Sequence, residues 1–107
     1  MDAKQIARYL GAMSIEERVQ IMKCLLEVSP EGREMLDIAA RIELGAAAVF
    51  KQLESLMGLE LVSVKSLESN KVYFANAALV EQLFDYMYRQ YGPAREKVTP
   101  VVEGSAD

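Results

Sequence analysis

The stretch that decides the fold is residues 37–62, which read DIAARIELGAAAVFKQLESLMGLELV. Its first part predicts a short helix that begins at Asp37, because an aspartate carboxylate can cap the first turn of a helix. Leu44-Gly45 then predicts a break, since glycine is a poor helix former. A second helix is expected over residues 46–57, where three apolar residues recur at helical spacing: Val49, Leu53 and Leu56. Two helices joined by a tight turn are typical of a helix-turn-helix pair.

Two further helices are predicted before this pair. Asp2 can cap the first, whose apolar residues lie three or four positions apart: Ala3, Ile6, Ala7, Leu10 and Met13. The second is expected from a capping box, in which Ser14 is the N-cap and Glu17 follows three positions later. This second helix runs to about Val28, and Ser29-Pro30-Glu31-Gly32 ends it.

After the helix-turn-helix pair the pattern changes from helical to strand-like. Two short segments are rich in β-forming residues: Leu61-Val62-Ser63-Val64-Lys65-Ser66 and Val72-Tyr73-Phe74. The polar residues 67–71 between them favour a turn, so we predict a two-stranded hairpin. A final helix is expected over residues 77–91, and Gly92-Pro93 ends it.

Together these elements predict a mainly α (α+β) fold, a winged helix-turn-helix domain over residues 1–92. The hairpin is its two-stranded wing, and the helices at its two ends are expected to mediate dimerisation. Residues 93–107 show no apolar period and are expected to form a flexible C-terminal tail. A chain of 107 residues, 51% hydrophobic and 26% charged, is long enough for one globular core.

The composition excludes several chemistries. The chain has no histidine and a single cysteine, Cys24, which excludes a serine–histidine–aspartate triad, a histidine-based metal site and an internal disulfide. We therefore expect no enzymatic activity, no cofactor and no bound metal. The sequence has neither a signal-peptide pattern nor an uninterrupted apolar run of about 18 residues, so a cytoplasmic protein without membrane contact is expected.

Two stretches of the chain resemble the ArsR–SmtB family of transcription regulators. Residues 18–25, RVQIMKCL, are similar to the second-helix signature of that family, and residues 37–62 are similar to its helix-turn-helix. Val72-Tyr73-Phe74 resembles the second strand of its wing. The resemblance implies a homodimeric regulator that binds double-stranded DNA and whose first and last helices form the dimer interface.

The chain departs from this family at the metal-ligand positions and at the start of the recognition helix. Glu34 and Leu36 stand where metal-sensing members have cysteines, and the histidines of the other metal site are absent. Gly45-Ala46-Ala47-Ala48 and Phe50 stand where polar side chains usually contact phosphates and base edges. The metal sites known in the family are therefore not expected here.

The candidate DNA-binding residues are polar side chains on the fourth helix and the wing: Lys51, Gln52, Ser55, Lys65 and Lys71. A dimer that presents two such helices is expected to bind a pseudo-palindromic operator with half-sites about one helical turn apart. Residues 35–74 nevertheless carry four basic and five acidic side chains, a net charge of −1. The alternative is a winged-helix protein–protein interaction module that has lost DNA binding, with Phe50 as an interface anchor.

The candidate dimer interface consists of apolar and aromatic residues of the first and last helices: Ile6, Tyr9, Leu10, Leu83, Phe84 and Met87. Aromatic residues are enriched at protein interfaces, and the last helix is unusually aromatic for a chain of this size.

Two residues of the second helix allow more specific expectations. Cys24 is either a small core residue or a thiol with a redox or intermolecular role. Arg18 lies inside the apolar arc of its helix, where a charged group needs a partner. We expect Arg18 to form a structural ion pair or a hydrogen bond to the backbone.

Overall fold

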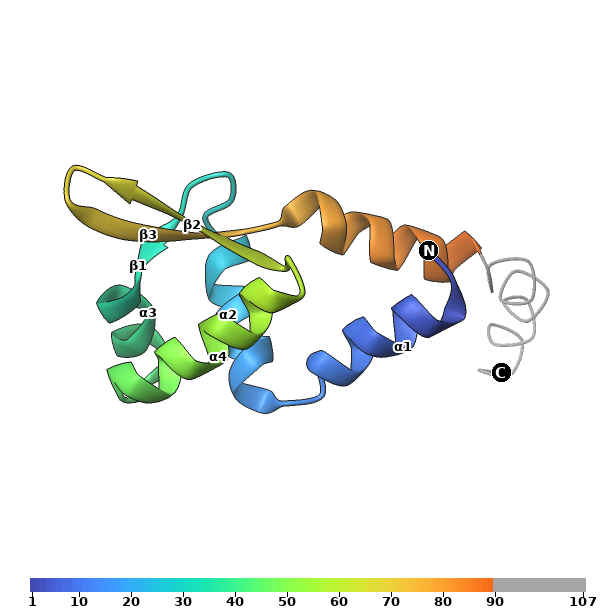
Figure 1. The fold of residues 1–107 in the computed structure, drawn as a ribbon, viewed down its shortest axis with the longest axis horizontal. Helices are drawn as coiled ribbons and strands as arrows, with labels where there is room; N and C mark the ends of the chain where they lie inside the picture. Colours follow the sequence, from blue (N-terminus) through green and yellow to red (C-terminus); the bar gives the residue numbers. More distant parts are fainter. Residues whose placement is uncertain (90–107) are drawn as a thin grey trace, which may run out of the picture.

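The computed structural model describes residues 1–89, which form a mainly helical protein with one small antiparallel sheet (Figure 1). The numbered helices are α1 (Ala3–Ala12), α2 (Glu16–Leu26), α3 (Met35–Ile42) and α4 (Ala46–Gly58). The strands are β1 (Arg33–Glu34), β2 (Val62–Leu67) and β3 (Asn70–Ala75). A last helix, which we call the final helix, is described over residues 77–89. The predicted helix end at Tyr91, the domain limit at residue 92 and the predicted tail 93–107 lie outside the described residues.

The helix α1 begins as its sequence predicts. Asp2 is the N-cap, and its Oδ1 accepts a 2.8 Å hydrogen bond from the backbone N–H of Gln5. The side-chain oxygen of Gln5 in turn accepts a 3.0 Å hydrogen bond from the backbone N–H of Asp2. This reciprocal capping box satisfies two backbone donors that the first turn of a helix leaves unpaired.

The capping box predicted for the second helix is wrong. Ile15 is the N-cap of α2, and no side chain caps this helix end. The Ser14 hydroxyl instead donates a 2.6 Å hydrogen bond to the carbonyl of Gly11 in the last turn of α1. The predicted end at Val28 is also too late, because α2 ends at Leu26 and turns follow it.

The start predicted for the third helix is wrong by two residues. Helix α3 begins at Met35 with Glu34 as its N-cap, and Asp37 lies in its first turn. The Asp37 carboxylate accepts hydrogen bonds from Arg33 (3.2 Å) and Arg41 (3.0 Å). Asp37 therefore serves as an ion-pair centre and not as a cap.

The wing belongs to a three-stranded sheet and not to a two-stranded one. The strand order is β1-β3-β2, and β1 pairs with β3 through Arg33↔Tyr73 and Glu34↔Val72. A strand of two residues shows no alternation, so the sequence pattern does not reveal it. The preceding Gly32 permits this pairing, because an added Cβ would lie 2.5 Å from the carbonyl oxygen of Tyr73.

The predicted hairpin is confirmed, with a tighter turn than expected. Strands β2 and β3 pair in register from Val62↔Ala75 to Leu67↔Asn70, so only Glu68 and Ser69 form the loop. Both loop residues have positive φ, 48° and 75°, as the favoured two-residue hairpin turns require.

The core lies where α2, α3 and α4 meet the sheet. Its fully buried side chains come from all three helices and from the residue before β2: Ile21, Leu25, Ile38, Val49, Leu53, Leu56 and Leu61. Asn76 fixes the chain between the sheet and the final helix. Its amide nitrogen donates to the carbonyl of Glu60 (2.9 Å), and its Oδ1 accepts from the backbone N–H of Leu79 (3.1 Å).

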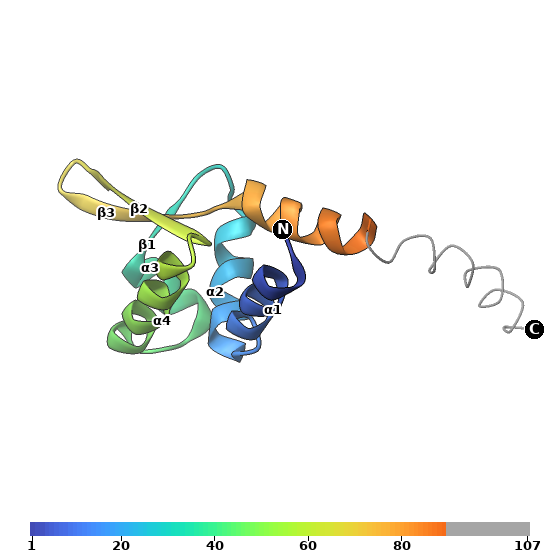
Figure 2. The same cartoon turned by 45° about the vertical axis from the view of Figure 1, so that its right-hand side comes forward.

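The wing and the final helix extend toward opposite ends of the described protein (Figures 1 and 2). Helix α2 lies between the helix-turn-helix pair α3–α4 and helix α1. The predicted winged helix-turn-helix architecture is thus confirmed for the described part of the chain. Within residues 1–89 no helix has the length and apolar character needed to cross a membrane.

Candidate nucleic-acid interface

Helix α4 has one face in the core and one face at the surface. Its inner face carries Val49, Leu53 and Leu56, all of which are fully buried. Its outer face carries small, apolar and charged side chains that are exposed: Ala47, Ala48, Phe50, Lys51 and Glu54. The helix is therefore held firmly from behind while its outer face remains free to contact a partner.

The three candidate DNA-binding residues of α4 differ in their exposure and in their hydrogen bonds. Lys51 is exposed. Ser55 is half-buried, and its hydroxyl donates a 3.4 Å hydrogen bond to the carbonyl of Lys51. Gln52 is half-buried, and its side-chain oxygen accepts a 2.8 Å hydrogen bond from Nε of Arg18. Of the three, Lys51 reaches furthest into solvent.

Arg18 links three helices. Besides its hydrogen bond to Gln52 in α4, its Nη1 donates a 3.3 Å hydrogen bond to the carbonyl of Ala12 at the end of α1. The hydrogen bond to the backbone that was expected for Arg18 is therefore confirmed. The contact with Gln52 was not foreseen, because 34 positions separate the two residues.

The two wing lysines are both exposed but point to opposite faces of the hairpin. Lys65 pairs with Val72, and Lys71 pairs with Ser66, the residue after Lys65. Because successive side chains of a strand alternate between faces, adjacent pairs point in opposite directions. The Lys65 ammonium lies 5.4 Å from the centroid of the Phe74 ring, in reach of a cation–π contact on its own face.

An arginine with little exposed surface, which sequence analysis did not single out, connects α2 to α3. The side chain of Arg33 is only 11% exposed. Its Nε donates a 3.0 Å hydrogen bond to the carbonyl of Cys24, and its Nη1 contacts Asp37 at 3.2 Å. Burial tends to raise the pKa of the Asp37 carboxyl, but the hydrogen bonds from Arg33 and Arg41 outweigh burial and hold that pKa below its usual value.

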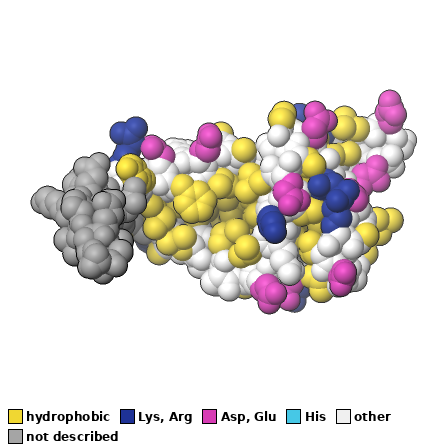
Figure 3. Space-filling view, turned by 180° about the vertical axis from the view of Figure 1, so that it is seen from behind, with side chains coloured by type: hydrophobic (Ala, Val, Ile, Leu, Met, Phe, Trp, Pro, Cys, Tyr) yellow, Lys and Arg dark blue, Asp and Glu magenta, His cyan; other side chains and the backbone are white. Residues whose placement is uncertain are grey.

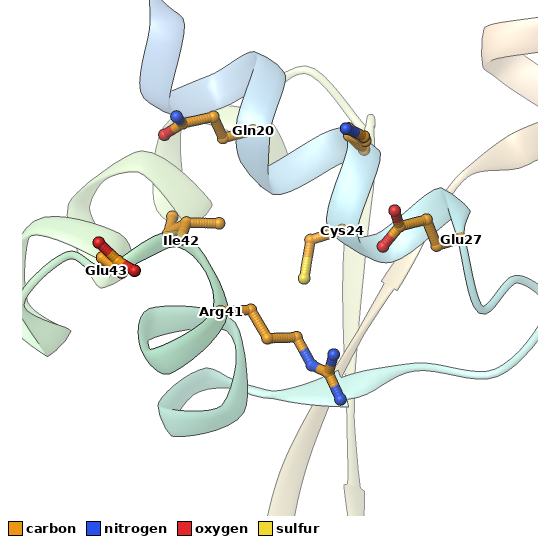
Figure 4. Close-up of a pocket in the computed structure, with 7 residues that line it drawn as sticks. Gln20, Cys24, Glu27, Arg41, Ile42 and Glu43 are labelled. Atoms are coloured by element: carbon orange, nitrogen blue, oxygen red, sulfur yellow. The ribbon is translucent and has the colours of Figure 1, made fainter.

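Cys24 lies in the core, which confirms its interpretation as a small core residue. It borders a pocket of about 670 Å³ between α2 and α3, into which Arg41 and Glu43 also project (Figure 4). Burial raises the pKa of the Cys24 thiol, and the positive charges of Arg33 and Arg41 oppose this only in part. The thiolate, which is the reactive form, is therefore disfavoured at neutral pH.

The six candidate interface residues fall into two groups. Leu10 and Phe84 are exposed, at 42% and 61%, and Tyr9 and Met87 are half-buried. Ile6 and Leu83 are already buried within the chain itself; Leu83 is 4% exposed. Leu10, Phe84, Tyr9 and Met87 therefore offer apolar surface to a partner. Ile6 and Leu83 instead pack inside the chain.

Metal ligands do not gather in the described part of the chain. Among residues 1–89 no three Cys, Asp or Glu side chains come together as a candidate metal site. Glu34 is exposed and serves as the N-cap of α3.

Comparison with solved structures identifies the class of fold. An ArsR-like transcriptional regulator from Rhodococcus sp. RHA1 is similar over 97% of this chain and 94% of its own, with a TM-score of 0.71 and 19% identity. A homodimeric winged helix-turn-helix DNA-binding domain from Mycobacterium bovis, a possible ArsR-family regulator, is similar over 88% of this chain and 84% of its own (TM-score 0.66, 21% identity). HlyU from Vibrio cholerae is similar over 85% of this chain and 98% of its own (TM-score 0.67, 24% identity).

These similarities are similarities of fold. No family model matches the sequence, and no curated protein matches it either. Two of these neighbours are described as an ArsR-like and a possible ArsR-family regulator, which confirms at the level of fold the resemblance that residues 18–25 and 37–62 indicated. The chain is a winged helix-turn-helix protein with the architecture of those regulators.

Proposed function

We propose that this protein is a DNA-binding transcription regulator of ArsR type that acts as a homodimer on a pseudo-palindromic operator. The observation that carries the proposal is helix α4, whose inner face is locked into the core while its outer face presents Lys51 at the surface. In helix-turn-helix proteins the second helix of the pair enters the major groove. The neighbour from Mycobacterium bovis, described as a homodimeric DNA-binding domain, supports both parts of the proposal.

We assign the contacts with DNA from the exposure and the hydrogen bonds of each side chain. Lys51 contacts a phosphate, because it is exposed and basic. Gln52 is held in place by Arg18 through its oxygen, so its NH₂ group is the part that faces a base edge. On the wing, Lys65 and Lys71 contact phosphates from opposite faces of the hairpin, which suits a wing tip that straddles the DNA backbone.

The same proposal assigns the dimer interface to α1 and the final helix. Leu10 and Phe84 supply exposed apolar surface that a second copy would bury. Two copies related by a two-fold axis would present two α4 helices, as a pseudo-palindromic operator requires. No metal is part of this mechanism, because Glu34 and Leu36 replace the cysteines that would hold it.

Salt-dependent DNA titration tests the proposal. The 107-residue chain is titrated, by fluorescence anisotropy, into labelled duplexes from the region upstream of its own gene at several salt concentrations. Because few basic residues face the DNA and each neutralised phosphate adds about −0.9, the slope of log K against log salt should be shallow, about −3 to −6. The absence of binding to any upstream duplex at low salt would refute the proposal.

Charge reversal identifies the surface that binds. We expect Lys51→Glu combined with Lys71→Glu to abolish DNA binding, since both changes place a negative charge against phosphates. Lys4→Glu combined with Lys23→Glu changes the net charge equally at exposed lysines outside α4 and the wing, and is the matched control. Equal losses in both double variants would mean that α4 and the wing are not the DNA-binding surface.

A second candidate function is favoured by two exposed apolar side chains on the helix-turn-helix pair. Phe50 on α4 is 41% exposed, and Leu36 on α3 is 69% exposed. Large exposed apolar residues are typical of protein interfaces, so this face would then bind another protein instead of DNA. Phe50→Ser separates the two functions: it would weaken a protein complex, whereas DNA binding should be retained or improved.

A further inference from the structure

Helix α4 carries a carboxylate on the same face that presents Lys51 to solvent. Ala47, Lys51 and Glu54 are exposed and follow one another at spacings of four and three residues. This spacing places the three side chains in one stripe along the helix. The buried residues of α4 occupy the other side, so a partner that contacts Lys51 also meets Glu54.

The Glu54 carboxylate is free to accept hydrogen bonds. Within residues 1–89 it takes part in no ion pair and no hydrogen bond. Lys51 lies three positions earlier on the same face, yet the two side chains form no ion pair. Asp37 and Asp85, by contrast, each form an ion pair with an arginine four positions away. Both oxygens of Glu54 are therefore available as acceptors for a partner.

The surroundings of Glu54 give a bound DNA little positive charge to spare. Residues 35–74 carry a net charge of −1. Figure 3 shows acidic and basic side chains interspersed over the half of the described protein that holds the helix-turn-helix pair and the wing. A carboxylate brought close to phosphates is repelled, so Glu54 lowers the affinity for every duplex that offers it no hydrogen-bond donor.

Only two of the four bases offer such a donor in the major groove. Cytosine presents its N4 amino group and adenine its N6 amino group, whereas guanine and thymine present acceptors there. In adenine the acceptor N7 lies beside the amino group and repels the second carboxylate oxygen. In cytosine a ring C–H takes that place, so cytosine is the better partner for a glutamate.

We propose that Glu54 determines the base preference of α4, with its carboxylate accepting a hydrogen bond from N4 of one cytosine in each operator half-site. This inference rests on the proposed DNA-binding function and adds the base that the helix selects. Lys51 attracts the backbone of any duplex. Glu54 opposes that attraction on every sequence that lacks cytosine at the position it faces.

Selection of duplexes from a random library by the 107-residue chain tests the inference. The unchanged chain should retain duplexes with a C·G pair at one fixed position of each half-site. Glu54→Ala should lose the preference at this position alone. Glu54→Gln should replace cytosine by adenine there, because a glutamine amide pairs with N6 and N7 of adenine. Glu81→Gln, at an exposed carboxylate of the final helix, is the matched control and should keep the cytosine preference.

Titration of a modified operator measures the contact itself. N4-methylcytosine at the selected position keeps the base pair but puts a methyl group in place of the N–H that faces the major groove. The affinity of the unchanged chain should fall about five- to 150-fold for each modified half-site. Glu54→Ala should bind the modified and the unmodified operator equally, since it has no carboxylate to accept from N4.

The outcomes separate this inference from the proposed function. If the unchanged chain selects an operator and Glu54→Ala selects the same one, Glu54 reads no base; the inference is then wrong while DNA binding stands. A uniform gain of affinity in Glu54→Gln with an unchanged operator would also overturn it, because the carboxylate would then only repel phosphates. If the chain retains no duplex at all, the proposed function fails and the inference fails with it.

Discussion

The helix-turn-helix half of the protein and its terminal helices bury their apolar residues to very different degrees. In α2, α3 and α4 the inward residues Ile21, Ile38 and Leu53 are completely buried within one chain. On α1 and the final helix, Leu10 and Phe84 remain exposed. The first half contains the fully buried core, although it also exposes Leu36 and Phe50, whereas the terminal helices contribute few buried side chains and expose Leu10 and Phe84. We therefore expect stability to depend mainly on the first half and the proposed dimerisation mainly on the terminal helices.

The largest effect should come from a cavity in the helix-turn-helix half. Leu53→Ala removes a fully buried side chain, so we expect a loss of about 2–5 kcal/mol in the free energy of unfolding. Leu10→Ala removes a side chain that is 42% exposed and should cost less, about 1 kcal/mol, in the single chain. Urea denaturation at one fixed protein concentration compares the free energies of unfolding of the two variants. Equal losses would contradict the division into two halves.

Substitutions at two glycines test the same comparison between the helix-turn-helix half and the terminal helices. An added methyl group at Gly32 meets the backbone of β3 at 2.5 Å, so Gly32→Ala should destabilise the protein by about 1–3 kcal/mol. Gly11 lies in α1 with no atom within 4 Å of an added Cβ. Gly11→Ala should therefore stabilise the chain by about 0.5–1 kcal/mol, because alanine is the better helix former. Thermal denaturation of both variants measures the two shifts; a stabilising Gly32→Ala would refute the close approach of β1 to β3.

Removing Arg18, which links the two halves, should have an intermediate effect on the free energy of unfolding. Arg18→Met removes the hydrogen bonds to Gln52 and to the carbonyl of Ala12, for an expected loss of about 1–2 kcal/mol. In a double-mutant cycle with Gln52→Ala the two losses should not add, because one hydrogen bond connects the residues. Strict additivity would show that Arg18 does not hold α4 through Gln52.

The smallest effect concerns acid stability. The pKa of Asp37 is lowered in the folded chain, so its ionised form stabilises the fold above the usual carboxyl pKa. That contribution is lost as the pH falls through the lowered pKa. Asp37→Asn should therefore be less stable than the parent at neutral pH, and the difference should shrink on acidification from about pH 5 to 2. A difference that stays constant with pH would contradict the ion pairs with Arg33 and Arg41.

Periodicity predicted most of the fold because the helices and the hairpin are regular over many residues. The capping carboxylate of Asp2 and the buried stripe of α4 were also visible in the sequence. The errors arose where a residue of capping type bonds to another group only three or four positions away instead of capping the helix. Asp37 looks like a cap but binds Arg33, and Ser14 looks like a cap but bonds back to Gly11.

The candidate site was less predictable than the fold. Lys51 follows from the helical wheel, whereas the contact of Gln52 with Arg18 joins residues 34 positions apart and leaves no local signal. The opposite directions of Lys65 and Lys71 depend on a two-residue turn whose exact length the sequence did not specify.

The molar mass of the 107-residue chain in solution, measured by light scattering, tests most directly that the terminal helices are completed by a second copy. The account predicts twice the single-chain mass of 11.9 kDa at micromolar concentration. Leu10→Asp combined with Phe84→Asp should reduce it to the single-chain value with the helical content retained, while Lys51→Glu combined with Lys71→Glu should leave it unchanged. A mass of 11.9 kDa for the unchanged chain, or a dimer that survives the Leu10 and Phe84 changes, would contradict the account.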